Sequence, residues 1–142
     1  MTEPSIWSAA ELKTRREATG ASVRDMMRLL GLSSESNYQR YEAGRQPVPA
    51  FAQAEVERLE QWLDVSVETV LDGARDLVRQ YGQPQTVDLL RWRKSADYDR
   101  DEPERAASIP FGVHARSIAR AREALLDEDF EVRLVYVDEE AS

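Results

Sequence analysis

Closely spaced helix start and stop signals fill the first fifty residues, and they constrain the fold more than any other feature. Two capping boxes occur there, in which a serine and an acidic side chain each bond a backbone N–H group at a helix start. A glycine follows each helical stretch, because glycine adopts the left-handed conformation that ends helices without strain. The pattern predicts three short helices, over residues 9–19, 22–30 and 34–43. The boxes are Ser8 with Glu11 and Ser22 with Asp25, and the glycines are Gly20, Gly31 and Gly44.

The remainder of the chain first continues with helical periodicity and then changes character after Gly82. Beyond that point, alternating and β-branched segments indicate strands on either side of one helix. We therefore expect a mainly α fold, with an N-terminal five-helix bundle over residues 1–82 and a small C-terminal α+β region (strand-helix-strand) over residues 83–142. The expected elements are helices 50–63, 66–81 and 113–127, strands 86–92 and 131–137, and a polar surface loop over 95–108.

Composition excludes several classes of function. The chain of 142 residues has no cysteine and one histidine, His114, so disulfides, thiolate metal sites and most catalytic triads are excluded. No Gly-rich phosphate loop or nucleophile elbow is present. We expect no enzymatic activity, no metal, no cofactor and no small-molecule ligand. The sequence also lacks a signal peptide and an apolar run near the ~20 residues that span a bilayer, which predicts a cytoplasmic protein without membrane contact.

The net charge of −8 is unevenly distributed. Residues 1–50 carry seven Lys/Arg against six Asp/Glu, whereas residues 51–142 carry twelve against twenty-one. The N-terminal part is therefore close to neutral and the acidity belongs to the rest. Such asymmetry suggests a different partner for each part.

Three short helices with a tight glycine-containing turn between the second and third form a helix-turn-helix. A helix fits the major groove of DNA, where polar side chains read base edges. With Tyr38 and Tyr41 turned toward the core, helix 34–43 presents a polar face outward. Ser22 and Ser33 stand at helix N-termini, where hydroxyl and N–H groups suit phosphate oxygens. The outward residues are Glu35, Ser36, Asn37, Gln39 and Arg40.

These residues resemble the Xre/Cro-type regulators of phages and bacteria. The resemblance covers residues 9–49 and rests on Arg16-Glu-Ala-Thr-Gly20, Ser22, Leu30-Gly31, and Tyr41-Glu42-Ala-Gly44-Arg45 with Pro47. It implies that Arg16 pairs with Glu42 as a structural pair. It also implies that Gly44, Arg45 and Gln46 follow the DNA phosphates after the recognition helix.

From Gly31 to Glu42 the chain is one residue longer than the common spacing of that family. The longer spacing is similar to that of a narrower group, the YdiL-like and anti-CRISPR-associated (Aca) repressors. Their organisation implies a helical linker and a small α/β dimerisation region after the helix-turn-helix. It further implies a homodimer that binds double-stranded DNA at an inverted-repeat promoter and represses its own phage or mobile-element operon.

The extra residue leaves two alignments of the recognition helix. Counting back from Glu42 places Ser36, Asn37, Gln39 and Arg40 in the groove, and we prefer this count because both tyrosines then stay in the core. Counting forward from Gly31 gives Ser34, Glu35 and Ser36 instead. A carboxylate near phosphates is repelled, so Glu35 is expected at the DNA only if it reads cytosine or excludes a wrong base.

Other interpretations stay open at this point. An antitoxin that binds a toxin through its acidic C-terminal half is the main alternative, and RNA binding through the same basic face is another. His114 lies on an apolar stripe, which favours a packing role over a pH switch at a dimer interface. The acidic stretch 97–104 lacks the glycine of a calcium loop and is expected to be solvated surface.

Overall fold

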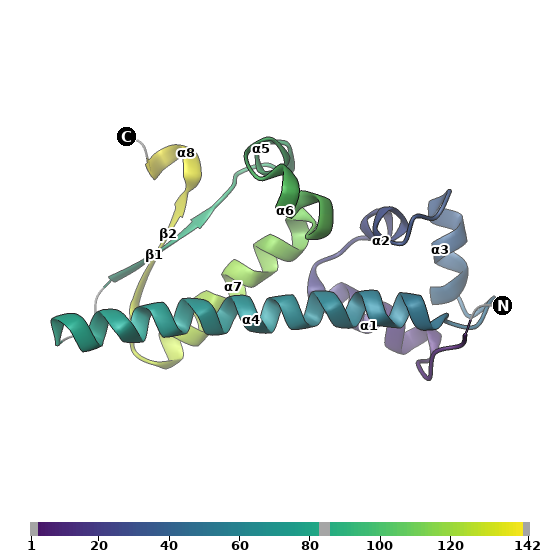
Figure 1. The fold of residues 1–142 in the computed structure, drawn as a ribbon, viewed down its shortest axis with the longest axis horizontal. Helices are drawn as coiled ribbons and strands as arrows, with labels where there is room; N and C mark the ends of the chain where they lie inside the picture. The colour runs from purple at the N-terminus through teal and green to yellow at the C-terminus, as the bar shows by residue number, and fades with distance from the viewer. Residues whose placement is uncertain (1–2, 83–85, 141–142) are drawn as a thin grey trace. The chain divides into compact units, whose positions relative to one another are not determined.

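The computed structural model describes residues 3–82 and 86–140 (Figure 1). The chain divides into two compact units, Met1–Gln61 and Trp62–Ser142, which are described separately below. The domain boundary expected at residues 82 and 83 adjoins positions 83–85, which lie outside the described residues.

The first unit contains the three predicted short helices, α1 (Ala9–Thr19), α2 (Val23–Leu29) and α3 (Glu35–Glu42). Each begins at a serine N-cap whose side chain accepts a backbone N–H bond, and the Ser22–Asp25 capping box is complete. Gly20 and Gly44 follow α1 and α3 in the left-handed conformation, with φ of 89° and 76°. Local signals therefore define these helices as the sequence predicted.

The core of the first unit is formed by apolar residues from all three helices and from the first turns of the next helix. These side chains are almost completely removed from water, which is the main source of stability in a unit of this size. The segment before α1 also joins the unit, because Pro4 forms an antiparallel bridge with Pro49 and the N–H of Ser5 donates to the carbonyl of Val48. The buried apolar residues are Leu12, Ala21, Met26, Tyr38, Val48, Ala52, Val56 and Leu59.

Helix α4 (Ala50–Tyr81) is continuous over 32 residues, so the expected break between residues 63 and 66 is wrong. The second of the two expected helices was to begin at Ser66, but no glycine or proline stands near that position to end the first. Apolar side chains also continue at helical spacing through Leu63, Val67 and Leu71, so packing favours helix on both sides of Ser66. The N-terminal bundle thus has one long helix where the sequence suggested two, and the fold class of a mainly helical chain with a small C-terminal sheet is confirmed.

The second unit contains a parallel pair of strands, β1 (Thr86–Arg91) and β2 (Glu131–Tyr136), aligned from Thr86 opposite Glu131 to Arg91 opposite Tyr136. Helix α7 (Phe111–Asp127) connects them and packs against both strands. Strand pairing is supported by a salt bridge between Arg133 and Asp88, 2.7 Å from nitrogen to oxygen. One buried apolar cluster of this unit consists of Leu71, Ala74, Leu89, Ala121, Leu125 and Phe130.

The segment over residues 95–108 is not the predicted surface loop but two short helices, α5 (Ser95–Asp101) and α6 (Pro103–Ser108). Tyr98 explains the difference, because its ring is fully buried and its hydroxyl donates to the carbonyl of Ile109 at 2.8 Å. Strand β2 ends at Tyr136, and a last helical turn, α8 (Val137–Glu140), follows. Within the described ranges, no helix combines the length and the apolar character needed to cross a membrane.

Candidate nucleic-acid interface

Helix α3 is fixed to the first unit by one face and leaves the other exposed. Tyr38 is fully buried, and its ring meets that of Tyr41 edge to face at 6.1 Å between centroids. Tyr41 in turn contacts the ring of Phe51 on α4 in the same manner. Tyr38 thus lies in the core, whereas Tyr41 is half-buried against Phe51 on the same side of the helix.

A buried salt bridge joins the end of α1 to the end of α3. The Arg16 guanidinium donates from Nε to Glu42 Oε2 at 2.7 Å and from Nη2 to Oε1 at 3.0 Å. Its Nη1 donates to the carbonyl of Ala21 at 2.9 Å, so the arginine also holds the turn before α2. The hydrogen bonds to Glu42 raise the pKa of Arg16, so this arginine stays charged. The position of α3 relative to α1 and α2 is therefore fixed by charge as well as by packing.

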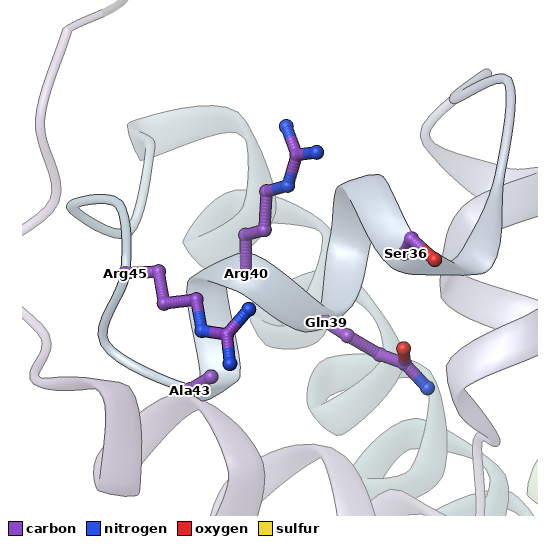
Figure 2. A pocket seen from close by; sticks show the side chains of 5 residues that line it. All are labelled: Ser36, Gln39, Arg40, Ala43 and Arg45. Carbon is purple, nitrogen blue, oxygen red and sulfur yellow. The ribbon is translucent and has the colours of Figure 1, made fainter.

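An open hollow of about 380 Å³ lies along the last turns of α3 (Figure 2). In that view Arg40 and Gln39 project from the helix in different directions, and Arg45 extends back from the following turn toward Ala43. Arg40 and Arg45 are exposed, and no salt bridge involves either one among the described residues. The hollow thus presents two uncompensated positive charges beside an amide. Its lining is Ser36, Gln39, Arg40, Ala43 and Arg45.

Asn37 differs from the other expected base-reading residues. It is partly buried, and its Nδ2 donates to the hydroxyl of Ser33 at 2.8 Å. The amide thereby ties the first turn of α3 to the loop before it. The NH2 group of Asn37, which would donate to adenine, thus already has a partner within the protein, whereas the side chain of Gln39 is exposed.

The serines at the starts of α2 and α3 include the two candidate phosphate-binding residues, Ser22 and Ser33, and one residue of the alternative groove alignment, Ser34. The hydroxyl oxygen of Ser22 accepts from the N–H of Asp25 at 3.0 Å, and that of Ser34 accepts from the N–H of Asn37 at 3.2 Å. Ser33 accepts from the Asn37 amide as described above. Each hydroxyl oxygen therefore accepts a bond within the protein, and a serine hydroxyl also has a proton that it can donate.

The residues after α3 contribute side chains rather than backbone amides. The N–H groups of Arg45 and Gln46 both donate to the carbonyl of Arg40, at 3.0 and 3.3 Å, and so complete the end of the helix. Gln46 is exposed and lines a second hollow with Tyr41 and neighbouring prolines. Glu35 is exposed in the first turn of α3.

The structure thus gathers Ser36, Gln39, Arg40 and Arg45 at one hollow and places Ser22, Ser33, Ser34 and Asn37 at helix starts. Sequence reasoning did not single out Ala43, which lines the hollow. The available signal was its place directly before Gly44, where a small side chain at the helix end leaves space beside Arg45.

His114 lies outside this interface, in the second unit. Its ring is buried, stacks on Tyr98 at 5.1 Å between centroids and meets Trp92 edge to face at the same distance. Its Nε2 has no hydrogen-bond partner among the described residues. Burial, with Arg105 and Arg91 nearby, lowers the pKa of His114 to about 4, so the ring is neutral at pH 7. This is the packing role that its apolar stripe predicted.

Comparison with known proteins agrees with the geometry of the first unit. A family model described as a helix-turn-helix domain matches residues 9–72. No curated protein matches the chain. The chain therefore carries a helix-turn-helix domain, and this domain indicates a DNA-binding regulator.

Proposed function

We propose that the protein is a sequence-specific transcriptional repressor that binds double-stranded DNA as a homodimer at an inverted repeat. Its operator lies in the promoter of its own operon. This operon is of the phage or mobile-element type, as the resemblance to the anti-CRISPR-associated repressors implies. The observation that carries the proposal is the exposed face of α3, where Gln39 stands beside Arg40 and Arg45, which form no salt bridge with the residues that the structure describes.

In this proposal α3 enters the major groove and its side chains contact base edges. Gln39 pairs with adenine through its exposed amide, and Arg40 pairs with guanine through two parallel N–H groups. Ser36 lines the same hollow and is short enough to let the helix approach the bases. Asn37 supports this arrangement from the start of the helix, through its bond to Ser33.

Phosphate contacts orient the domain on the duplex. The hydroxyl groups of Ser22 and Ser33 can donate to phosphate oxygens, and Arg45 supplies a full charge beyond the end of α3. Such contacts fix the register of the helix without reading sequence, because the phosphate backbone is the same at each base pair.

Dimerisation is part of the proposal because residues 1–50 have a net charge of only +1. Phosphate neutralisation supplies much of the affinity of DNA-binding proteins, so a single domain with this charge binds weakly. A dimer joins two weak contacts on half-sites about one helical turn (~34 Å) apart, which raises the affinity without new contacts. The acidic second unit, which DNA repels, is suited to forming the dimer.

The direct test is footprinting of the full-length protein on the DNA upstream of its own gene, across a series of salt concentrations. Protection of an inverted repeat with half-sites about one turn apart is the expected result. Absence of protection at moderate salt, together with stoichiometric binding of a neighbouring gene's product, would instead support an antitoxin. Protection of random DNA with equal affinity would overturn sequence-specific repression.

A further inference from the structure

The sheet of the second unit is small and open. Within residues 3–82 and 86–140, β1 and β2 pair only with each other, so each has an outer edge without a strand partner. At the end of β2 the N–H of Tyr136 donates to Glu139 Oε2 at 3.4 Å, a long bond to an exposed side chain. Parallel sheets are usually buried, and two-stranded sheets are marginally stable by themselves. An uncovered strand edge is also a template for pairing with another chain.

The face of β2 that lies beside Leu89 carries exposed apolar side chains. Leu134 stands opposite Leu89 in the register of the sheet, yet Leu89 is 5% exposed and Leu134 is 53% exposed. Tyr136 is also exposed, although Arg93 covers one face of its ring. The apolar face of the sheet is therefore completed over β1 and left incomplete over β2.

We infer that β2 pairs antiparallel with β2 of a second copy of the chain, about a two-fold axis at Leu134, to form a four-stranded sheet in the order β1-β2-β2-β1. The inference rests on the proposed function only in its homodimer, and it names the surface by which that dimer forms. The evidence is the open edge, the exposed apolar side chains and the self-complementary order of residues along β2.

The sequence of β2 selects this register. A two-fold axis through a residue keeps the apolar faces of both copies on the same side, and only axes at Arg133 or Leu134 pair five residues of the strand. An axis at Arg133 would place two guanidinium groups opposite each other, and like charges in that position are destabilising. An axis at Leu134 pairs Leu134 with its own copy, Val132 with Tyr136, and Arg133 with Val135.

Cysteine substitution offers a clean test, because the natural chain contains no cysteine. In full-length Leu134→Cys the two substituted residues would oppose each other at the axis. Opposed residues of two antiparallel strands have Cα atoms about 4.5–5.5 Å apart, which is within the range that a disulfide spans. Mild oxidation is expected to give a covalent dimer. The matched control is Val65→Cys, a residue of similar exposure (56%) on α4, which is expected to remain uncrosslinked.

Mixed variants test the register itself. Val132→Cys and Tyr136→Cys oppose each other across the axis, so the mixture is expected to form a crosslinked heterodimer. Neither variant alone is expected to crosslink, because each residue lies about 13 Å from its own copy at a rise of ~3.3 Å per residue. Efficient self-crosslinking of Val132→Cys would overturn this register.

A charge at the axis gives an independent measurement. Leu134→Lys in the full-length protein would bring two unpaired ammonium groups together, which should weaken dimerisation about a hundredfold or more in sedimentation equilibrium. Leu126→Lys, at 41% exposure on α7, is the control and should leave the dimer unchanged. Circular dichroism of both variants is the check that they are folded.

The outcomes separate this inference from the proposed function. A wild-type dimer that protects an inverted repeat, but is neither crosslinked at residue 134 nor weakened by the lysine, would refute the β2 interface alone. A wild-type protein that remains monomeric at high concentration would also refute it. Crosslinking at residue 134 without any DNA protection would support the interface and refute the repressor.

Discussion

Arg16 and Glu42, 26 residues apart, form a bidentate salt bridge with nitrogen–oxygen distances of 2.7 and 3.0 Å, and their side chains are only 10% and 8% exposed. The pair joins the first and third helices of the helix-turn-helix. The guanidinium also bonds the carbonyl of Ala21, so three separate parts of the unit meet at one cation.

Arg16→Ala is expected to lower the free energy of unfolding by about 3–5 kcal/mol, because it leaves the Glu42 carboxylate buried without its partner. Urea denaturation followed by circular dichroism measures the change. Arg28→Ala is the control, since Arg28 is 57% exposed and its pair with Asp25 should contribute at most about 1 kcal/mol. Equal losses of unfolding free energy for the two substitutions would show that burial of the Arg16–Glu42 pair does not add to its contribution to stability.

Protonation of His114 is expected to destabilise the protein in mild acid. Burial lowers the folded-state pKa of His114 from its ordinary value of 6.5 to about 4, so the stabilising contribution is complete above pH 6.5 and is lost as the pH falls toward 4. The loss over this window is roughly 3 kcal/mol at about 1.36 kcal/mol per pH unit. Unfolding free energies at pH 7 and pH 4.5 should show it.

His114→Phe supplies the comparison for that pH dependence. The ring still stacks between Tyr98 and Trp92 but cannot take up a proton, so the variant should lose less stability between pH 7 and pH 4.5 than the wild type. The pKa values of Asp88 and Asp101 are lowered by arginine partners, and their contribution at still lower pH is common to both proteins. Identical pH profiles would show that the histidine does not titrate in this range.

Substitutions in α3 and after it should separate base reading from phosphate contact. Gln39→Ala and Arg40→Ala are each expected to cost about 1–3 kcal/mol on the operator and to relax specificity at one base position. Arg45→Ala is expected to weaken binding uniformly and to reduce the slope of log affinity against log salt by about 1. Fluorescence anisotropy on operator and scrambled DNA gives both quantities. A uniform loss for Arg40→Ala would reassign that residue to the phosphates.

Alanine substitutions at two glycines are expected to change the stability of the protein in opposite directions. Gly44 has φ of 76°, and an alanine there should destabilise the protein by about 1–2 kcal/mol, because a Cβ is unfavourable in the left-handed conformation. Gly73 is exposed within α4 with no atom within 4 Å of an added Cβ, so Gly73→Ala should stabilise by about 0.5–1 kcal/mol. Thermal denaturation should shift the melting temperature in opposite directions.

Local chemistry explains which elements could be predicted from the sequence. Serine caps and terminal glycines define α1, α2 and α3, because each signal acts within a few residues of its helix. The inward positions of Tyr38 and Tyr41 followed from their spacing. The same reasoning failed at Ser66, where packing continues one helix through the expected break, and at Tyr98, whose burial depends on tertiary contacts with Trp92 and His114.

Two features of the structure, one at the candidate interface and one in the second unit, could not be predicted. The hydrogen bond between Asn37 and Ser33 depends on the geometry of the turn, and it changes Asn37 from an outward group to a partly engaged one. The parallel pairing of β1 with β2 depends on the whole chain between them. The sequence marks both strands, but alternation within a strand does not identify its neighbour.

The parallel register of the sheet has a consequence for synthesis on the ribosome. Asp88 and Arg133 are partners separated by 45 positions, so β1 is made long before β2 exists. At about 5–20 residues per second, the wait lasts roughly 2–9 s. During that interval Val87, Leu89 and Leu90 have no strand to pair with, so this apolar segment of the nascent chain waits for its partner strand to be made.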